Sequence, residues 1–263
     1  MKLLLCVLFG WVVMSVAMTL LWWVQYRRHN AGIVDVAGSL GVGLLGVLFA
    51  WQGDGAPTRR LLLAGMISIW ALRLSVHLVR RIGGEREDGR YRRLRGRWGD
   101  RAQPYLFVLF QVQASWSVLF ALPLLLAARN PSPLGMLDLL AVVIWIVALA
   151  GESLADFQLA RFRRDPANRG KVCRDGLWYT SRHPNYFFEW VHWWAYVCMG
   201  WGAPLGWLTL AGPILMLFFL FKITGIPPTE EQALASRGED YRRYQASTSA
   251  FFPWPPKEKE NRS

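Results

Sequence analysis

The stretch LLLCVLFGWVVMSVAMTLLWWV, residues 3–24, decides the fold class of this chain. It contains 22 residues and no charged side chain, and about 20 apolar residues in a helix cross the ~30 Å hydrocarbon core of a bilayer. A secretory signal peptide has a shorter apolar region that ends in small residues, whereas this stretch continues into Gln25, Tyr26, Arg27 and Arg28. The sequence therefore predicts a retained transmembrane helix.

Six more apolar stretches follow along the chain, at residues 33–51, 61–79, 105–128, 134–155, 187–201 and 205–221. Only helices and closed barrels span membranes, because backbone polar groups in hydrocarbon must all be hydrogen-bonded within the protein. The ten-residue alternating pattern of barrel strands is not found in these stretches. The stretch 187–201 is short and holds Glu189 and His192, so its helix is expected to start near Pro184 or to tilt. We predict an all-α integral membrane protein with seven transmembrane helices.

The basic residues are distributed unevenly over the connecting segments. Residues 26–30 hold 2 of them, residues 80–101 hold 9, residues 156–183 hold 7, and the segment from Lys222 onward holds 7. A seven-span topology places on the opposite side only Lys2, Arg59, Arg60 and Arg129. Cytoplasmic loops of membrane proteins carry the excess of Lys and Arg. We therefore predict a multi-pass protein of the cytoplasmic (inner) membrane, with the N-terminus outside and the C-terminus cytoplasmic.

The composition excludes several other classes. Hydrophobic residues make up 53% of the chain, which excludes intrinsic disorder. The chain carries 30 Lys and Arg against 18 Asp and Glu, a balance that nucleic-acid-binding proteins also show. The cations follow the topology rule, however, and no zinc-finger, RNP or helix-turn-helix pattern accompanies them, so we expect membrane lipids and no nucleic acid as their partner. Three cysteines without a CxxC pair predict neither a disulfide framework nor a cysteine zinc site.

Ionisable residues inside or beside the predicted spans are candidates for a functional site, because charge is costly in hydrocarbon. Those toward the predicted cytoplasmic side are Asp35, Arg73, His77, Glu152, Asp156, Glu189 and His192. Several are three or four positions apart and so share a helix face, which favours a common cavity open to the cytosol. The alternative is that Arg73 pairs with Asp35 or Glu152 and only fixes packing. No HExxH and no second ExxH is present, so we expect no metal.

A dense group of cations precedes the sixth predicted span. It comprises Arg163, Arg164, Arg169, Lys171, Arg174 and Arg182. Arginine presents paired donors to phosphate oxygens, so this group suits a phosphorylated cofactor. No GxxxxGKS or GxxxxGKT sequence offers another phosphate site. A solvated collar of cations beside the membrane is the alternative interpretation.

The nine residues Ser181-Arg-His-Pro-Asn-Tyr-Phe-Phe-Glu189 resemble the C-terminal signature of the steroid 5-alpha-reductase and sterol reductase superfamily. Sterol reductases carry a similar Arg-His-Pro-Asn-Tyr followed three residues later by an acid. The whole chain is similar to the bacterial membrane branch of that superfamily. Further similar stretches are residues 32–37, 70–74, 87–91, 160–172, 241–244 and 248–254.

This resemblance implies a reductase that holds NADPH and acts on a lipid-like substrate. The reaction would reduce a carbon–carbon double bond, conjugated to a carbonyl, in a steroid or other lipid-like molecule. On the family pattern, the residues that hold the cofactor or line its pocket are Asp156, Arg163, Lys171, Arg182, His183, Asn185, Tyr186, Glu189, Glu230 and Tyr241.

The substrate side departs from the family pattern. Steroid reductases bind the steroid 3-ketone with a Gln-Glu pair in the second span and a Tyr in the third. In this chain the Gln-Glu position reads Val34-Asp35, and the Tyr position falls near Trp70. Trp70 has no hydroxyl, so it cannot bind a steroid 3-ketone as the family's Tyr does. We assign Trp70 and Arg73 to the substrate side and Asp35 to catalysis, as a donor that stabilises charge on the carbonyl oxygen. An ion pair of Asp35 with Arg73 is the alternative role.

Two other functional classes remain open. Isoprenylcysteine methyltransferases use S-adenosylmethionine and share an Arg-His-Pro-x-Tyr element and a late Glu-Glu, which this chain has at Glu230-Glu231. Asn185 and the group of cations favour the reductase. A transporter is the third class. The sequence contains no inverted repeat and no paired broken helices, which argues against it.

The domain organisation follows from the same features. The chain is expected to form a single membrane domain, residues 1–263. Residues 1–130 hold the first four helices and the substrate side, and residues 131–256 hold the last three helices and the cofactor motif. Residues 257–263 are expected to be a frayed tail.

Overall fold

The computed structural model describes residues 2–83, 87 and 89–257. Every regular element in these residues is helical, as predicted. Six helical segments are long and apolar enough to cross a membrane, so the chain is a multi-pass membrane protein with six candidate spans. The predicted frayed tail, residues 257–263, lies outside the described residues apart from Lys257.

The ten α-helices are α1 Lys2–Arg28, α2 Ile33–Gln52, α3 Pro57–Gly83, α4 Gly89–Trp98, α5 Ala102–Ala127, α6 Met136–Arg164, α7 Leu177–Thr180, α8 Pro184–Gly200, α9 Ala211–Phe218 and α10 Ile226–Ser247. Each predicted apolar stretch falls on helical structure. The sixth falls on α8, whose 17 residues rise only about 26 Å, less than the ~30 Å core. The seventh span and the orientation of the chain stay predictions.

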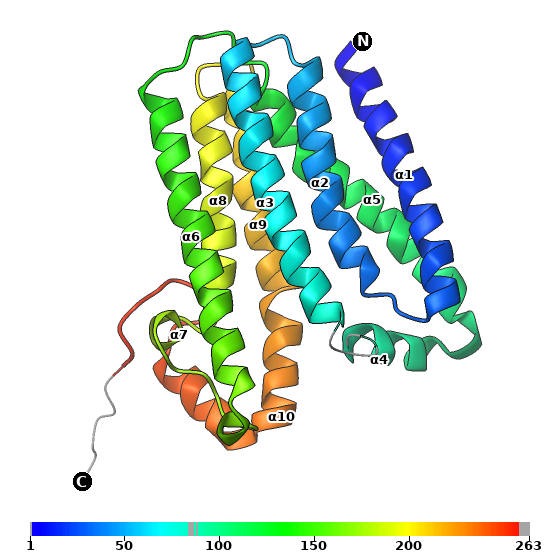
Figure 1. The fold of residues 1–263 in the computed structure, drawn as a ribbon, viewed down its shortest axis with the longest axis vertical. Helices are drawn as coiled ribbons and strands as arrows, with labels where there is room; N and C mark the ends of the chain where they lie inside the picture. Colours follow the sequence, from blue (N-terminus) through cyan, green and yellow to red (C-terminus); the bar gives the residue numbers. More distant parts are fainter. Residues whose placement is uncertain (1, 84–86, 88, 258–263) are drawn as a thin grey trace. The chain divides into compact units, whose positions relative to one another are not determined.

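The chain divides into two compact units, and each is described by itself. Unit 1 comprises residues 1–135 and 199–209. Within it α2 lies between α1 and α3 and also packs on α5 (Figure 1). A Cβ atom on Gly43 of α2 would lie only 2.4 Å from the Cβ of Ala71 on α3, so glycine permits the close approach of these two helices.

Hydrogen bonds of Arg59 and Asn130 hold the connecting loops together at one end of unit 1. The Arg59 side chain is buried and donates to the carbonyl oxygens of Asn130 at 3.2 Å, Ser132 at 2.6 Å and Pro133 at 3.1 Å. The Asn130 amide donates to the carbonyl oxygens of Met199 at 2.9 Å and Trp201 at 3.1 Å. These bonds provide partners for backbone carbonyl groups that the turns leave without hydrogen bonds.

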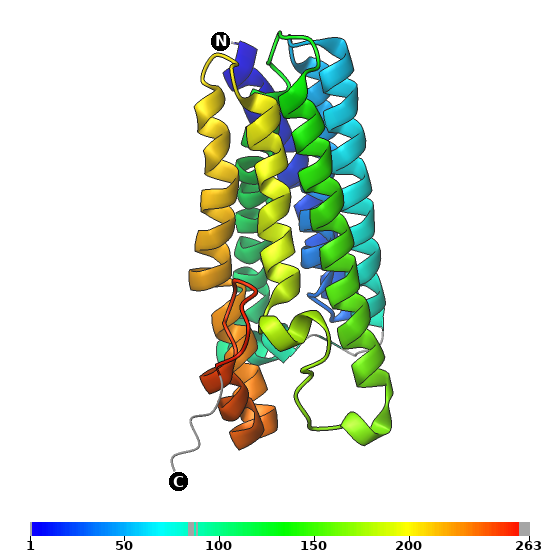
Figure 2. The ribbon, with the colours of Figure 1, turned by 90° about the vertical axis from the view of Figure 1, so that its left-hand side faces the viewer.

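Unit 2 comprises residues 136–198 and 210–263. Helices α6 and α8 run side by side in it (Figure 1, Figure 2). The ring of Phe188 on α8 lies against Gly151 of α6, where a Cβ atom would come within 2.5 Å of the ring. The indole of Trp178 on α7 donates to the carbonyl oxygen of Ala155 at 2.9 Å, so the segment before α8 is tied to the end of α6.

Helix α10 changes direction at Gly238. This residue has φ 52° and ψ −125°, which glycine adopts without the steric cost of a Cβ atom. The chain therefore turns in the middle of α10, so that its second half, residues 239–247, can face residues of its first half. This turn positions the side chains of the candidate site.

Candidate functional site

The turn before α8 is shaped by Ser181, His183 and Pro184. Pro184 begins α8, where the missing N–H costs nothing, and it disfavours helical backbone at His183. The Ser181 hydroxyl accepts from the His183 backbone N–H at 3.1 Å and donates to the Phe251 carbonyl oxygen at 2.9 Å. The residues of the predicted motif thus begin on a fixed turn.

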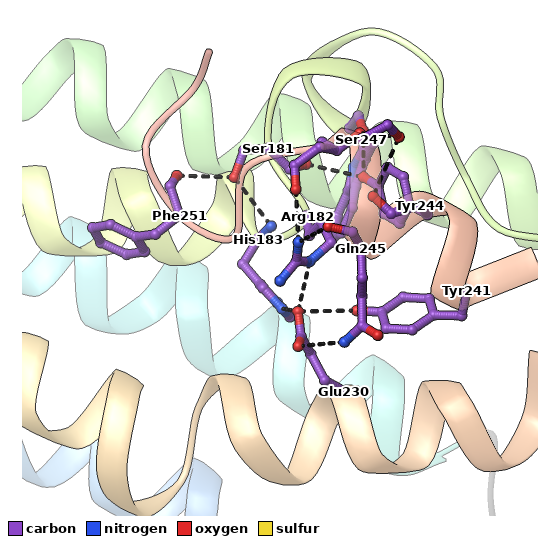
Figure 3. Close-up of polar contacts among 11 residues, drawn as sticks. Ser181, Arg182, His183, Glu230, Tyr241, Tyr244, Gln245, Ser247 and Phe251 are labelled. Atoms are coloured by element: carbon purple, nitrogen blue, oxygen red, sulfur yellow. Dashed lines mark hydrogen bonds and ion pairs between the residues drawn. The ribbon is translucent and has the colours of Figure 1, made fainter. Parts of the chain in front are cut away.

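The Glu230 carboxylate is the centre of a polar cluster in unit 2 (Figure 3). Its Oε1 atom accepts from Arg182 Nε at 2.7 Å, and lies 3.2 Å from His183 Nε2 and 3.4 Å from the Tyr241 hydroxyl. Its Oε2 atom accepts from the Gln245 amide at 2.7 Å. We call these five residues the Glu230 cluster. Both carboxylate oxygens are occupied by donors from the chain itself.

Arg182 also holds the end of α10. Its Nη1 atom donates to the carbonyl oxygens of Gln245 at 3.0 Å and Thr248 at 2.6 Å. The last carbonyls of a helix lack intrahelical partners and carry partial negative charge, so a guanidinium is favourable there. The cation predicted to contact a phosphate therefore serves as a tie between the α8 turn and α10.

A C-terminal strap, residues 248–254, runs along the turn before α8. The Arg182 backbone N–H donates to the Ser249 carbonyl oxygen at 2.9 Å, and the Trp254 backbone N–H donates to the Thr180 carbonyl oxygen at 2.9 Å. The Tyr244 hydroxyl donates to the carbonyl oxygens of Ser181 and Trp178. The segment 248–254, which is one of the stretches similar to the reductase superfamily, thus holds the backbone of the Ser181–Glu189 motif in place.

His183 is buried within the Glu230 cluster and stacks on Tyr186, with ring centroids 5.2 Å apart and planes at 4°. Burial lowers the pKa of the His183 imidazole from 6.5, and this effect outweighs the opposing influence of the Glu230 carboxylate. The neutral ring has one N–H, which Nε2 can donate to Glu230 when Nδ1 is unprotonated. Tyr186 is held in turn by its hydroxyl, 3.2 Å from that of Thr229.

The lowered pKa of His183 predicts that acid destabilises the fold. Well above pH 6.5 the folded and unfolded chains both carry a neutral imidazole. As the pH falls through 6.5 the unfolded chain takes up the proton first, because the pKa of His183 is lowered in the folded chain. The melting temperature should therefore fall more steeply between about pH 6.5 and pH 5 in the wild type than in His183→Gln, whose amide keeps a donor but does not titrate. Thermal unfolding in buffered detergent checks this. Equal pH slopes in the two proteins would contradict it.

Asp156 and Asn185 form a second polar group in unit 2. The Asn185 amide donates to Asp156 Oδ1 at 3.2 Å and links α8 to α6. Glu189 lies one turn further along α8 on the same face, and both carboxylates are buried. Buried carboxylates beside an amide are groups that can orient a polar ligand.

Arg163 and Lys171 are the remaining predicted cofactor residues. Their side chains are exposed on the end of α6 and on the segment that follows it. The Lys171 backbone is held by Arg237, whose Nε donates to the Lys171 carbonyl oxygen at 3.0 Å. Next to it, the Val172 N–H donates to Asp240 at 3.1 Å. The backbone of this cationic segment is therefore anchored on α10 while its side chains face outward.

The predicted substrate residues lie in unit 1. Asp35 of α2 forms an ion pair with Arg90 of α4 at 2.7 Å and accepts from the Tyr91 hydroxyl at 2.7 Å. This arrangement suits the alternative ion-pair role of Asp35, with Arg90 as its partner. Trp70 is buried and Arg73 is half-buried on α3. The donor role of Asp35 stays a prediction.

The structure also contains site residues that the sequence analysis did not single out. Gln245 bonds the second oxygen of Glu230, and Tyr244 fixes the turn before α8. Tyr241 and Gln245 are four positions apart on the second half of α10, a spacing that places both on one face. The spacing could have shown from sequence that Tyr241 and Gln245 share a helix face. It could not have shown the turn at Gly238 that directs this face toward Glu230.

The fold and these clusters define a multi-pass helical membrane protein with a polar site assembled on the turn before α8. The chain belongs to the family described as "Protein of unknown function (DUF1295)", whose model matches residues 21–248. That range contains every predicted site residue. The chain is also similar to "Uncharacterized protein C594.04c" of Schizosaccharomyces pombe (strain 972 / ATCC 24843), with 26% identity over 263 aligned positions that cover 89% of this chain and 75% of that protein.

Proposed function

We propose that this protein is an NADPH-dependent reductase of the cytoplasmic membrane, with its cofactor site facing the cytoplasm. Its substrate would be a steroid or other lipid-like molecule with a carbon–carbon double bond conjugated to a carbonyl. The observation that carries the proposal is the meeting of motif residues at Glu230. Arg182 and Glu230, which are 48 positions apart, are both assigned to the cofactor pocket by the resemblance, and they bond directly.

The chain offers distinct groups for distinct parts of the cofactor. The exposed cations Arg163 and Lys171 suit the phosphate groups, and Asn185 and Glu189 suit polar groups of the nicotinamide and its ribose. Arg182 and Glu230 use their donors and acceptors on each other, on His183 and on α10, so in this proposal they fix the wall of the pocket. These residue types fit the groups of the cofactor, and in this proposal the contacts fall on Arg163, Lys171, Asn185 and Glu189.

Bound NADPH would supply a hydride to the β-carbon of the conjugated double bond. The chain must then provide a donor near the carbonyl oxygen and a route for a proton to the α-carbon. Asp35 is the candidate donor from the sequence, and its ion pair with Arg90 favours the alternative in which Asp35 is a structural ion-pair partner. A lipid-like substrate would reach such a site from the bilayer.

The cofactor assignment is tested by the thermal unfolding of the detergent-solubilised protein with NADPH, NADH or S-adenosylmethionine. A ligand at about a hundred times its Kd stabilises the fold by about 2.7 kcal/mol, which for a chain of this size raises the melting temperature by on the order of 5–10 °C. We expect this shift with NADPH and a much smaller one with NADH, which lacks the 2′-phosphate.

The outcome also separates the reductase from the methyltransferase. A shift with S-adenosylmethionine alone would replace the reductase by a methyltransferase. The absence of a shift with all three ligands would remove the cofactor proposal altogether.

A further inference from the structure

Helix α5 carries three glutamines, Gln103, Gln111 and Gln113, within a segment apolar enough to span the membrane. A side-chain amide in hydrocarbon costs several kcal/mol unless its donors and acceptor are bonded. Two of the three are bonded to α1. Gln103 accepts from the Gln25 amide at 2.8 Å, and Gln111 donates to the Thr19 hydroxyl at 3.0 Å.

Gln113 differs from its two neighbours. No hydrogen bond joins its side-chain amide to any residue that the structure describes. The Ser117 hydroxyl donates to the Gln113 backbone carbonyl oxygen at 3.0 Å and leaves the amide untouched. The amide lies over Gly38 of α2, where a Cβ atom would come within 2.2 Å of Gln113 Nε2. The residue stands near the middle of α5, Ala102–Ala127, and is only partly buried. The fold thus keeps room for an amide at the middle of a span and leaves the amide accessible.

The surroundings of this amide are polar for a membrane interior. The Ser117 hydroxyl lies 3.5 Å from the Gly38 carbonyl oxygen. Next to Gly38, the hydroxyls of Ser39 on α2 and Ser75 on α3 lie 2.8 Å apart. Polar side chains inside a membrane bundle mark ligand sites and pathways.

We propose that the Gln113 amide binds the carbonyl or hydroxyl oxygen of a neutral, lipid-like ligand between α2 and α5. An amide both donates and accepts, so it matches either oxygen, and an uncharged apolar ligand is the kind that reaches this depth from the bilayer. Gly38 provides the space for the amide. This site lies in unit 1 and depends on no cofactor, so it stands or falls independently of the reductase proposal.

Whether Gln113→Leu raises or lowers the melting temperature of the ligand-free protein tests the proposal before the ligand is identified. Gln113→Leu replaces an unbonded amide by an apolar side chain of similar size, and should raise the melting temperature of the ligand-free protein by on the order of 2–4 °C. Gln111→Leu is the matched control, because it removes the bond to Thr19 and should lower the melting temperature. A lowered melting temperature for Gln113→Leu would show a structural role and overturn the proposal.

Lipid capture tests the binding role directly. The purified protein is incubated with the neutral-lipid extract of the host membrane, and the retained lipids are identified by mass spectrometry. We expect the wild type and Gln111→Leu to retain a lipid with a carbonyl or hydroxyl group, and Gln113→Leu to retain at least about ten times less, since each lost 1.4 kcal/mol is tenfold in affinity.

Gly38→Ala provides an independent variant. Its Cβ atom would displace only the end of the flexible Gln113 side chain, so the fold should survive while capture is lost. Equal retention by the wild type and Gln113→Leu would overturn the proposal, whatever the change in melting temperature.

Discussion

Glu230→Leu should lower the free energy of unfolding by about 3 kcal/mol, which is on the order of 6–12 °C in melting temperature. The Arg182 side chain is only 11% exposed and Glu230 only 15%, so the substitution leaves a nearly buried guanidinium facing an apolar side chain. The Gln245 amide and the Tyr241 hydroxyl lose their acceptors, which are the two oxygens of the same carboxylate. Thermal or chemical unfolding in detergent measures the loss.

The neighbouring carboxylate provides the control. Glu231 lies next to Glu230 on α10 but is exposed, so Glu231→Leu should change stability by no more than about 0.5 kcal/mol. Arg182→Met combined with Glu230→Leu should recover part of the loss, because no buried charge is then left without its partner. Equal effects of the two single leucine variants, or strictly additive losses in the double variant, would contradict the assigned role of Glu230.

The membrane helices could be predicted from the sequence because the bilayer acts on each segment separately. Each apolar stretch must bond its own backbone groups whatever its neighbours do, so length and charge suffice to find a helix. Segments outside the membrane lack this constraint. Helix α4 lies in a stretch that the sequence indicated only as a basic loop, and α10 lies in one that was read only as a tail after Lys222.

The pairings within the site could not be predicted in the same way. The resemblance placed Arg182 and Glu230 in one pocket, but the bond between them depends on the positive φ of Gly238, which turns α10 back on itself. The sequence offered Arg73 of a neighbouring span as an alternative partner of Asp35, and the structure pairs Asp35 with Arg90 of α4. Long-range partners are set by tertiary geometry, which local patterns do not contain.

Gln113 was missed for a different reason. The sequence analysis looked for ionisable residues in the spans, since charge is the larger cost in hydrocarbon. An amide is neutral, and three glutamines on one helix look alike in sequence. Only the structure separates the two that bond α1 from the one that does not.

Asn185→Ala and Glu189→Ala should each abolish the stabilisation by NADPH while the protein remains folded and inserted in the membrane. At a concentration about a hundred times the wild-type Kd, a loss of this size removes up to about 2.7 kcal/mol of ligand-linked stability. The reason is position: Asn185 lies on the first turn of α8, bonded to Asp156, and Glu189 lies one turn beyond it on the same face. The shift in melting temperature with NADPH measures the effect.

Asn130→Ala separates loss of the cofactor from loss of stability. The Asn130 amide is buried, donates two hydrogen bonds and accepts one in unit 1. Its removal should therefore lower the melting temperature of the ligand-free protein by at least as much as Asn185→Ala. The NADPH shift of Asn130→Ala should nevertheless equal that of the wild type, because that residue is not in the proposed site. If NADPH stabilises Asn185→Ala and Glu189→Ala as much as the wild type, the α8 face does not bind the cofactor, and the proposed site must be abandoned even if NADPH itself binds.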